Sequence, residues 1–139
     1  MNPWMRDPRV EKSELDGFEA ERAERRGDPS SARALYHGAA DGYAQVALGV
    51  PADYPNTRSD LAIAAVACFA RAGDFGRAVE FARRVLAERD ALTDDGAAEI
   101  ERISRSYAAL LAPPSATEAV APRGIRLRDE VRGKFKRAA

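Results

Sequence analysis

Apolar residues recur at intervals of three and four along most of the chain, and short runs rich in glycine, proline and aspartate interrupt them. Such spacing marks one face of an α-helix, because 3.6 residues complete each turn. The interruptions fall at Gly27-Asp28-Pro29, at 49–57 and at Gly73-Asp74. Glycine and proline end helices, so these runs mark the loops between successive helices. The pattern therefore predicts an all-α protein.

The first two predicted helices form one pair. Ser13 can cap the first helix, which should end at Gly27. The second helix should begin after the turn, with Ser30 or Ser31 available to bind its free backbone amides, and run to about Ala47. A loop at 49–57 separates this pair from the rest of the chain.

Three further helices are expected after that loop. The third starts at Asn56 or Thr57, ends at Gly73, and is apolar nearly all round, which is typical of a helix in the middle of a bundle. The fourth covers Phe75 to Arg89, and the fifth starts near Thr93 and ends at Leu111 as a capping helix. On the solvent face of the fourth helix we expect the charged residues Arg77, Glu80, Arg83, Arg84 and Glu88.

The chain divides into four predicted parts: an irregular N-terminal arm at 1–12, a helical domain at 13–111, a Pro/Ala linker at 112–122 and a basic tail at 123–139. The arm contains Pro3 and Pro8 and lacks periodicity. Its single tryptophan, Trp4, is expected either to anchor a docked segment or partner, or to pack on its own domain.

Charge is distributed unevenly although the formal net charge of the 139 residues is zero. Residues 1–122 hold 15 Lys and Arg against 20 Asp and Glu, whereas 123–139 hold seven Lys and Arg against Asp129 and Glu130. The body therefore carries about −5 and the tail about +5. Within the tail Leu127, Val131 and Phe135 are spaced by four, so a helical tail would have an apolar stripe beside its basic face.

Residues for catalysis or metal binding are scarce. His37 is the only histidine and Cys68 the only cysteine, and no glycine-rich phosphate loop, serine elbow or zinc-protease motif occurs. We therefore expect no enzyme activity, no cofactor, no metal and no small-molecule substrate. One cysteine allows no intrachain disulfide, the start lacks a signal-peptide pattern, and the longest apolar run, 61–70, is too short to span a bilayer. These features predict a cytoplasmic protein.

Residues 73–86 resemble the second half of a tetratricopeptide repeat (TPR) in their Gly-Asp-aromatic turn and in Ala78, five residues after the glycine. A fainter copy covers Ala23 to Ala40. The two turn glycines are 46 residues apart, whereas a regular array spaces them roughly 34 apart. The resemblance implies two TPR-like helical hairpins plus a capping helix, and a concave face lined by the first helix of each hairpin.

A groove on that face would bind another protein, so the resemblance implies a non-catalytic adaptor or scaffold subunit. The residues expected to contact a protein partner are Glu21, Glu24, Arg25, Ile63 and Arg71 in the groove and Leu127, Arg128, Val131, Phe135 and Lys136 in the tail.

Two alternatives rest on the basic tail. It could bind nucleic acid or an anionic membrane, although Phe135 is its only aromatic residue and stacking on bases is weakly supported. It could instead dock on the acidic groove of its own copy or of a neighbouring one, which would make the protein a homo-oligomeric structural subunit. The opposite charges of body and tail make such docking natural.

Overall fold

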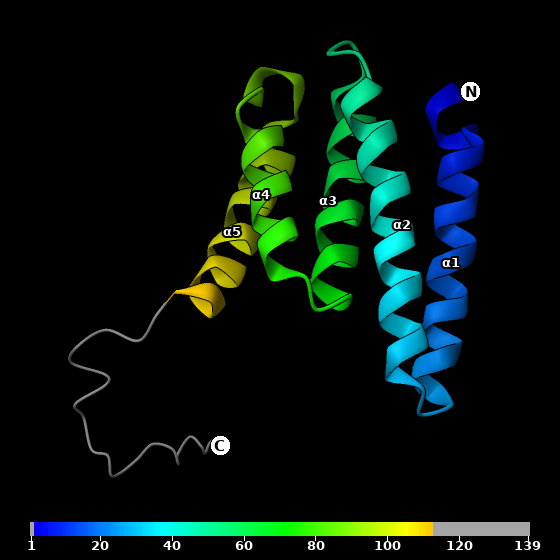
Figure 1. Ribbon diagram of the computed structural model, residues 1–139. Coiled ribbons are helices and arrows are strands. Elements are labelled where there is room, and N and C mark those ends of the chain that lie inside the picture. Colours follow the sequence, from blue (N-terminus) through cyan, green and yellow to red (C-terminus); the bar gives the residue numbers. More distant parts are fainter. Residues whose placement is uncertain (1, 113–139) are drawn as a thin grey trace, which may run out of the picture.

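The computed structural model describes residues 2–112, and every regular element in this part of the chain is a helix (Figure 1). The all-α prediction is confirmed, with two helical hairpins, α1–α2 and α3–α4, followed by a last helix, α5. The elements are η1 (Pro3–Arg6), α1 (Pro8–Arg25), α2 (Pro29–Gly49), α3 (Pro55–Arg71), α4 (Phe75–Leu86), η2 (Arg89–Ala91) and α5 (Asp94–Leu111).

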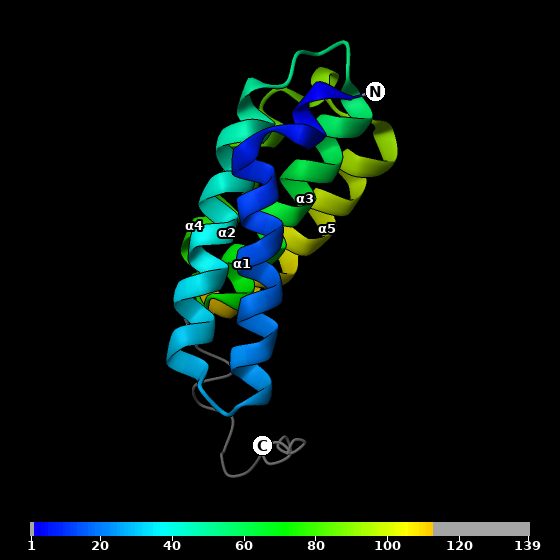
Figure 2. The same cartoon turned by 90° about the vertical axis from the view of Figure 1, so that its right-hand side faces the viewer.

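Helix α3 lies at the centre and packs against α2, α4 and α5. In Figure 2, α2 and α4 lie on one side of the stack and α3 and α5 on the other. Leu61, Val66 and Phe69 of α3 are buried in the main hydrophobic core. The nearly all-round apolar character of this helix follows from its position, because three neighbouring helices cover it.

The turns at Gly27 and Gly73 repeat the same local structure. Both glycines have positive φ, +78° and +81°, a left-handed conformation that residues with a side chain rarely adopt. Asp28 then caps α2 by accepting a hydrogen bond from the Ser31 amide, and Asp74 caps α4 by accepting one from the Arg77 amide. The two predicted hairpin turns are therefore confirmed.

Close packing of α1 on α2 depends on small side chains. Ser13 of α1 is buried against Gly42 of α2. A Cβ added at Gly42 would overlap the Ser13 hydroxyl and lie 3.0 Å from the carbonyl oxygen of Arg9. These two residues therefore set how closely the helices approach, and so they position α1 over the rest of the stack.

The prediction of an irregular arm over 1–12 is wrong, because α1 begins at Pro8 rather than at Ser13. Asp7 accepts a hydrogen bond from the Arg9 amide at 2.8 Å, and Pro8 occupies the first helical position, where its missing N–H is harmless. Ser13 is a buried packing residue and not a cap. Trp4 packs on its own domain, with its ring 4.6 Å from that of Tyr54.

Two helix ends also differ from the prediction, and at a third helix end only the burial of two leucines differs. Helix α3 begins at Pro55 with no side-chain cap, and Thr57 is buried within its first turn. Helix α4 ends at Leu86, so residues expected in its last turn belong to a turn and to η2. At the end of α5, Leu110 and Leu111 are exposed although their spacing placed them on the core stripe.

Arg58 holds the ends of two helices in place from inside the protein. Only 5% of this residue is exposed. Its Nη1 donates to the Val50 carbonyl oxygen at 2.8 Å and to that of Leu48 at 3.4 Å, and its Nη2 pairs with Glu88. Because these carbonyls end α2 and Glu88 follows α4, one buried guanidinium fixes the α2–α3 loop against the second hairpin.

Candidate functional site

Three of the predicted groove residues meet where α1 approaches α3. The Arg71 guanidinium lies 3.2 Å from Glu24 and 3.6 Å from Glu21, measured from its Nη2 and Nη1 atoms to the carboxylate oxygens. The same guanidinium lies over the ring of Tyr36, 4.4 Å from its centre. Tyr36 Oη donates a hydrogen bond of 2.8 Å to Glu24. We call these four residues the Arg71 cluster.

Burial decides what each member of the cluster contributes. Arg71, Glu21 and Glu24 are about half exposed, so each ion pair adds little to stability. Tyr36 is 1% exposed, and burial, aided by its hydrogen bond to Glu24, raises its pKa to about 12. The phenol therefore stays protonated at neutral pH and keeps donating to Glu24. The cluster holds α1, α2 and α3 in a fixed arrangement and neutralises Arg71.

Beside this cluster the surface is hollowed to a cavity of about 450 Å³. Its apolar wall includes Phe18, which is 64% exposed, and Tyr43, while Glu14 carries negative charge at its edge. Burial raises the pKa of Tyr43 to about 12, so this hydroxyl is also neutral. We call the cavity the α1–α3 groove; its lining residues are Glu14, Gly17, Phe18, Glu21, Tyr36, Tyr43, Cys68 and Arg71.

The other two predicted groove residues lie elsewhere. Arg25 is exposed in the last turn of α1 and does not line the groove. Ile63 lines a separate hollow of about 640 Å³ between α3 and α5, together with Asp60, Asp94 and Asp95. Both hollows are lined in part by α3. Together their lining residues include five carboxylates but one arginine, Arg71.

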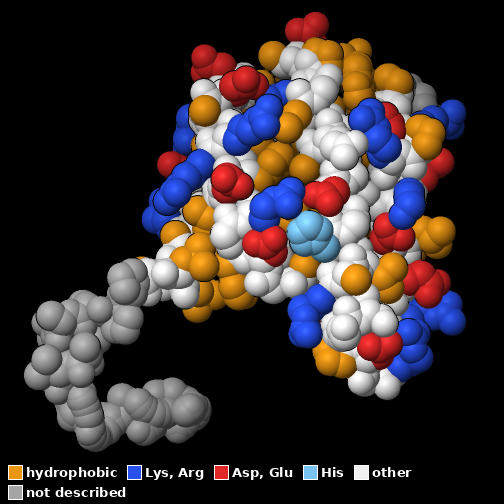
Figure 3. Space-filling model, in the orientation of Figure 1, with side chains coloured by type: hydrophobic (Ala, Val, Ile, Leu, Met, Phe, Trp, Pro, Cys, Tyr) orange, Lys and Arg blue, Asp and Glu red, His pale blue; other side chains and the backbone are white. Residues whose placement is uncertain are grey.

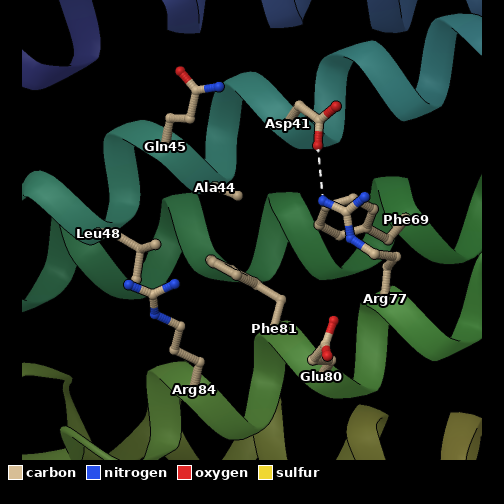
Figure 4. Close-up of a pocket in the computed structure, with 9 residues that line it drawn as sticks. All are labelled: Asp41, Ala44, Gln45, Leu48, Phe69, Arg77, Glu80, Phe81 and Arg84. Carbon is tan, nitrogen blue, oxygen red and sulfur yellow. Dashed lines mark hydrogen bonds and ion pairs between the residues drawn. The ribbon is translucent and has the colours of Figure 1, made fainter.

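A second cavity, of about 430 Å³, lies between α2 and α4 and was not predicted (Figures 3 and 4). Phe69 and Phe81 provide its apolar surface, and at one end Arg77 donates to Asp41 at 3.1 Å while lying 4.8 Å from the centre of the Phe69 ring. Its charges balance, because it carries two arginines and two acids. We call it the α2–α4 cavity; its lining residues are Asp41, Ala44, Gln45, Leu48, Phe69, Arg77, Glu80, Phe81 and Arg84.

His37 and Cys68 have structural surroundings. His37 lies between two aspartates, with its Nδ1 3.5 Å from Asp41 and its Nε2 3.4 Å from Asp74, and its ring meets Phe69 edge-on. Cys68 is a half-buried free thiol whose pKa is raised by burial, so it is protonated at neutral pH and weakly nucleophilic.

Within residues 2–112, no group of three or more His, Cys, Asp or Glu side chains could hold a metal ion. No helix in that range is long and apolar enough to cross a membrane. The tail residues Leu127, Arg128, Val131, Phe135 and Lys136 lie outside the described residues, as do the linker beyond Ala112 and the tail itself.

The sequence carried partial signals for these surfaces. The sequence predicts Glu21, Glu24 and Arg71 as groove residues, whereas the helical spacing of Phe18 and Tyr43 indicates only the apolar faces of α1 and α2. The α2–α4 cavity was missed because Arg77, Glu80 and Arg84 were assigned to a solvent face. Phe69 and Phe81 were assigned to the core, and only the docking of α4 on α2 and α3 creates a hollow above them.

No protein-family model, curated protein or solved structure matches this chain.

Proposed function

We propose that this protein is a non-catalytic adaptor that binds a basic, amphipathic segment of another protein in the α1–α3 groove. The observation that carries the proposal is the combination of exposed aromatic surface and an excess of negative charge in a single hollow. Phe18 stands largely exposed beside Tyr43, while Glu14 and Glu21 carry negative charge at the edge. An apolar floor within an acidic rim is complementary to an apolar stripe flanked by lysine and arginine.

The two kinds of residue would have different roles in binding. Aromatic side chains supply buried anchors, and a few such anchors carry most of the affinity of a protein interface. Rim carboxylates speed association and select basic partners, and they add less to affinity because solvent screens them. The Arg71 cluster ties together the three helices that line the groove, so binding would order few side chains.

The repeated hairpin turn supports the proposal that the stack is TPR-like. Gly27 and Gly73 share their positive φ, and each is followed by an aspartate that caps the next helix. Two hairpins and a capping helix then provide a shaped surface and no reactive group. On this proposal the mechanism is complementarity of shape and charge, without a chemical step.

The test is a nuclease-treated pull-down from native cells with the full chain as bait. Three baits are compared: the wild type, the groove variant Glu14→Lys/Glu21→Lys, and the control Asp53→Lys/Asp90→Lys. The control makes the same charge change at exposed sites outside the groove. A captured protein is identified by mass spectrometry and its binding to each purified bait is measured.

We expect a partner that binds the wild type and the control equally and the groove variant at least about tenfold more weakly, a difference of about 1.4 kcal/mol. Equal binding to all three baits would contradict the proposal. Recovery of nucleic acid alone, when nuclease is omitted, would favour a tail that binds nucleic acid.

A further inference from the structure

We propose that the basic segment 123–139 of the same chain docks in the α1–α3 groove and covers it. The segment lies outside the described residues, but its amino-acid sequence can be compared with the geometry of the groove. Three properties must match for such docking: charge, apolar spacing and reach. Each is considered in turn.

Charge favours the groove over the α2–α4 cavity. The segment holds seven Lys and Arg against two acids. The groove presents Glu14 and Glu21, with Glu24 beside them, and its one arginine, Arg71, is already paired with Glu21 and Glu24. In the α2–α4 cavity two arginines balance two acids, so this cavity offers a basic segment no net attraction.

Apolar spacing also fits. Leu127, Val131 and Phe135 recur every four residues, so on a helix they form one stripe about 12 Å long, at 1.5 Å per residue. The groove offers the exposed ring of Phe18, the half-buried ring of Tyr43 and the Cys68 side chain as apolar surface. Docking would remove the exposed Phe18 ring from water, which favours the docked state.

Reach is sufficient for docking within one molecule. Figure 1 shows that α3 and α5 end at the same end of the molecule, and these two helices pack against each other. Packed helices lie about 8–10 Å apart, and residues 112–122 can span about 36–40 Å when extended. A short tether also raises the effective concentration of the tail to the millimolar range. Docking within one molecule is therefore favoured over docking on a second copy.

Docking would regulate the groove, and this consequence rests on the proposed function. The tail would occupy the surface that a partner needs, so a partner must compete with a tethered basic segment. A variant that releases the tail should then bind its partner more tightly than the wild type. The docking itself requires no partner and is measured on the purified full chain, so its failure would leave the proposed function standing.

Cys68 provides a built-in reporter because it is the only cysteine and it lines the groove. The rate at which a small neutral reagent alkylates Cys68 is measured for the wild type, Val131→Asp and Gly133→Asp. The two variants add the same charge two positions apart, which places them on opposite faces of a helix. We expect Val131→Asp, but not Gly133→Asp, to speed the reaction about tenfold, since a tail docked nine-tenths of the time protects to that extent. Equal rates in all three chains would overturn the proposal.

A second readout measures proximity directly. In the full chain, with oxidised glutathione at a fixed concentration as the oxidant, Val131→Cys should form a disulfide with Cys68 about tenfold faster than Gly133→Cys, at a rate independent of protein concentration and reduced by salt. Equal rates at the two positions would mean random collision and would overturn docking. Disulfides found mainly between two copies would overturn docking in cis.

Discussion

Two of the hollows in this helical stack, the α1–α3 groove and the α2–α4 cavity, are nearly equal in volume, about 450 Å³ and about 430 Å³, yet they differ in charge balance. In the α2–α4 cavity Arg77 and Asp41 pair with each other, and one further arginine and one further acid balance. In the α1–α3 groove acids outnumber the single arginine, which is itself paired. A balanced hollow has little field beyond its own rim, whereas a hollow with a net negative charge attracts partners of the opposite charge. Volume alone therefore does not identify a binding surface, and charge balance distinguishes the two.

The largest predicted loss of stability comes from replacing Arg58, which supports the end of α2 near the cavity wall. Arg58→Ala removes a buried guanidinium that satisfies the carbonyls of Leu48 and Val50 at the end of α2, near the cavity wall. Buried carbonyls left without partners, together with the space left behind, should lower the free energy of unfolding by about 3 kcal/mol. Urea denaturation measures the loss. Arg105→Ala, at an exposed site on α5, is the control and should change stability by less than about 0.5 kcal/mol.

A smaller loss should come from displacing the wall of the groove. Gly42→Ala places a methyl group against Ser13 and the Arg9 backbone, so α1 must shift away from α2. We expect a loss of about 2 kcal/mol, together with weaker binding in the groove. Gly49→Ala, in the same helix with no atom near its new Cβ, should cause no loss. Equal thermal stability of the two variants would show that α1 and α2 are not in close contact at Gly42.

Tyr36→Phe tests how much the hydrogen bond from Tyr36 to Glu24 contributes to the stability of the Arg71 cluster. The change removes the hydroxyl that donates to Glu24 and leaves the ring beneath Arg71. The expected loss is about 1 kcal/mol, because Glu24 is half exposed and water can replace the lost donor. Tyr43→Phe is the matched control, since the Tyr43 hydroxyl has no hydrogen-bond partner within residues 2–112, and its stability should be nearly unchanged. A larger loss for Tyr43→Phe would contradict this reading of the cluster.

The last predicted effect is a loss of stability at alkaline pH, caused by the two tyrosines that line the groove. Burial raises the pKa of Tyr36 and of Tyr43 to about 12, above the value of about 10 expected in the unfolded chain. Their contribution to stability is therefore complete below pH 10 and is lost as the pH rises from about 10 to about 12. Melting temperatures measured across this range should fall less steeply for Tyr36→Phe than for the wild type. An equally steep fall in melting temperature for the variant and the wild type would contradict the raised pKa of Tyr36.

Much of the fold could be predicted from local chemistry. The turns at Gly27 and Gly73 were recognisable because glycine followed by a capping aspartate is a local signal. The start of α1 was misjudged because Pro8 was read as a breaker, although proline after a capping Asp7 favours a first helical turn. Ser13 was taken for a cap because its burial depends on Gly42, which is distant in sequence.

The candidate site was less predictable because it depends on how the helices dock. Glu24 and Arg71 were each expected on a concave face, but their ion pair forms only when α1 and α3 take the observed register. Phe18 follows the apolar spacing of α1, but 64% of it is exposed because the close packing of α1 on α2 does not cover it. Spacing assigns a residue to one face of a helix, while tertiary packing decides whether that face is covered.

We propose that a partner binds in the α1–α3 groove and not in the α2–α4 cavity. Hydrogen exchange of the full chain, with and without the purified partner identified by pull-down, tests it most directly. We predict slower exchange on binding in the groove-lining parts of α1 and α3, around residues 14–21 and 68–71, with little change around 77–84 in α4. Slower exchange confined to 41–48 and 77–84 would place the partner in the α2–α4 cavity and contradict the claim.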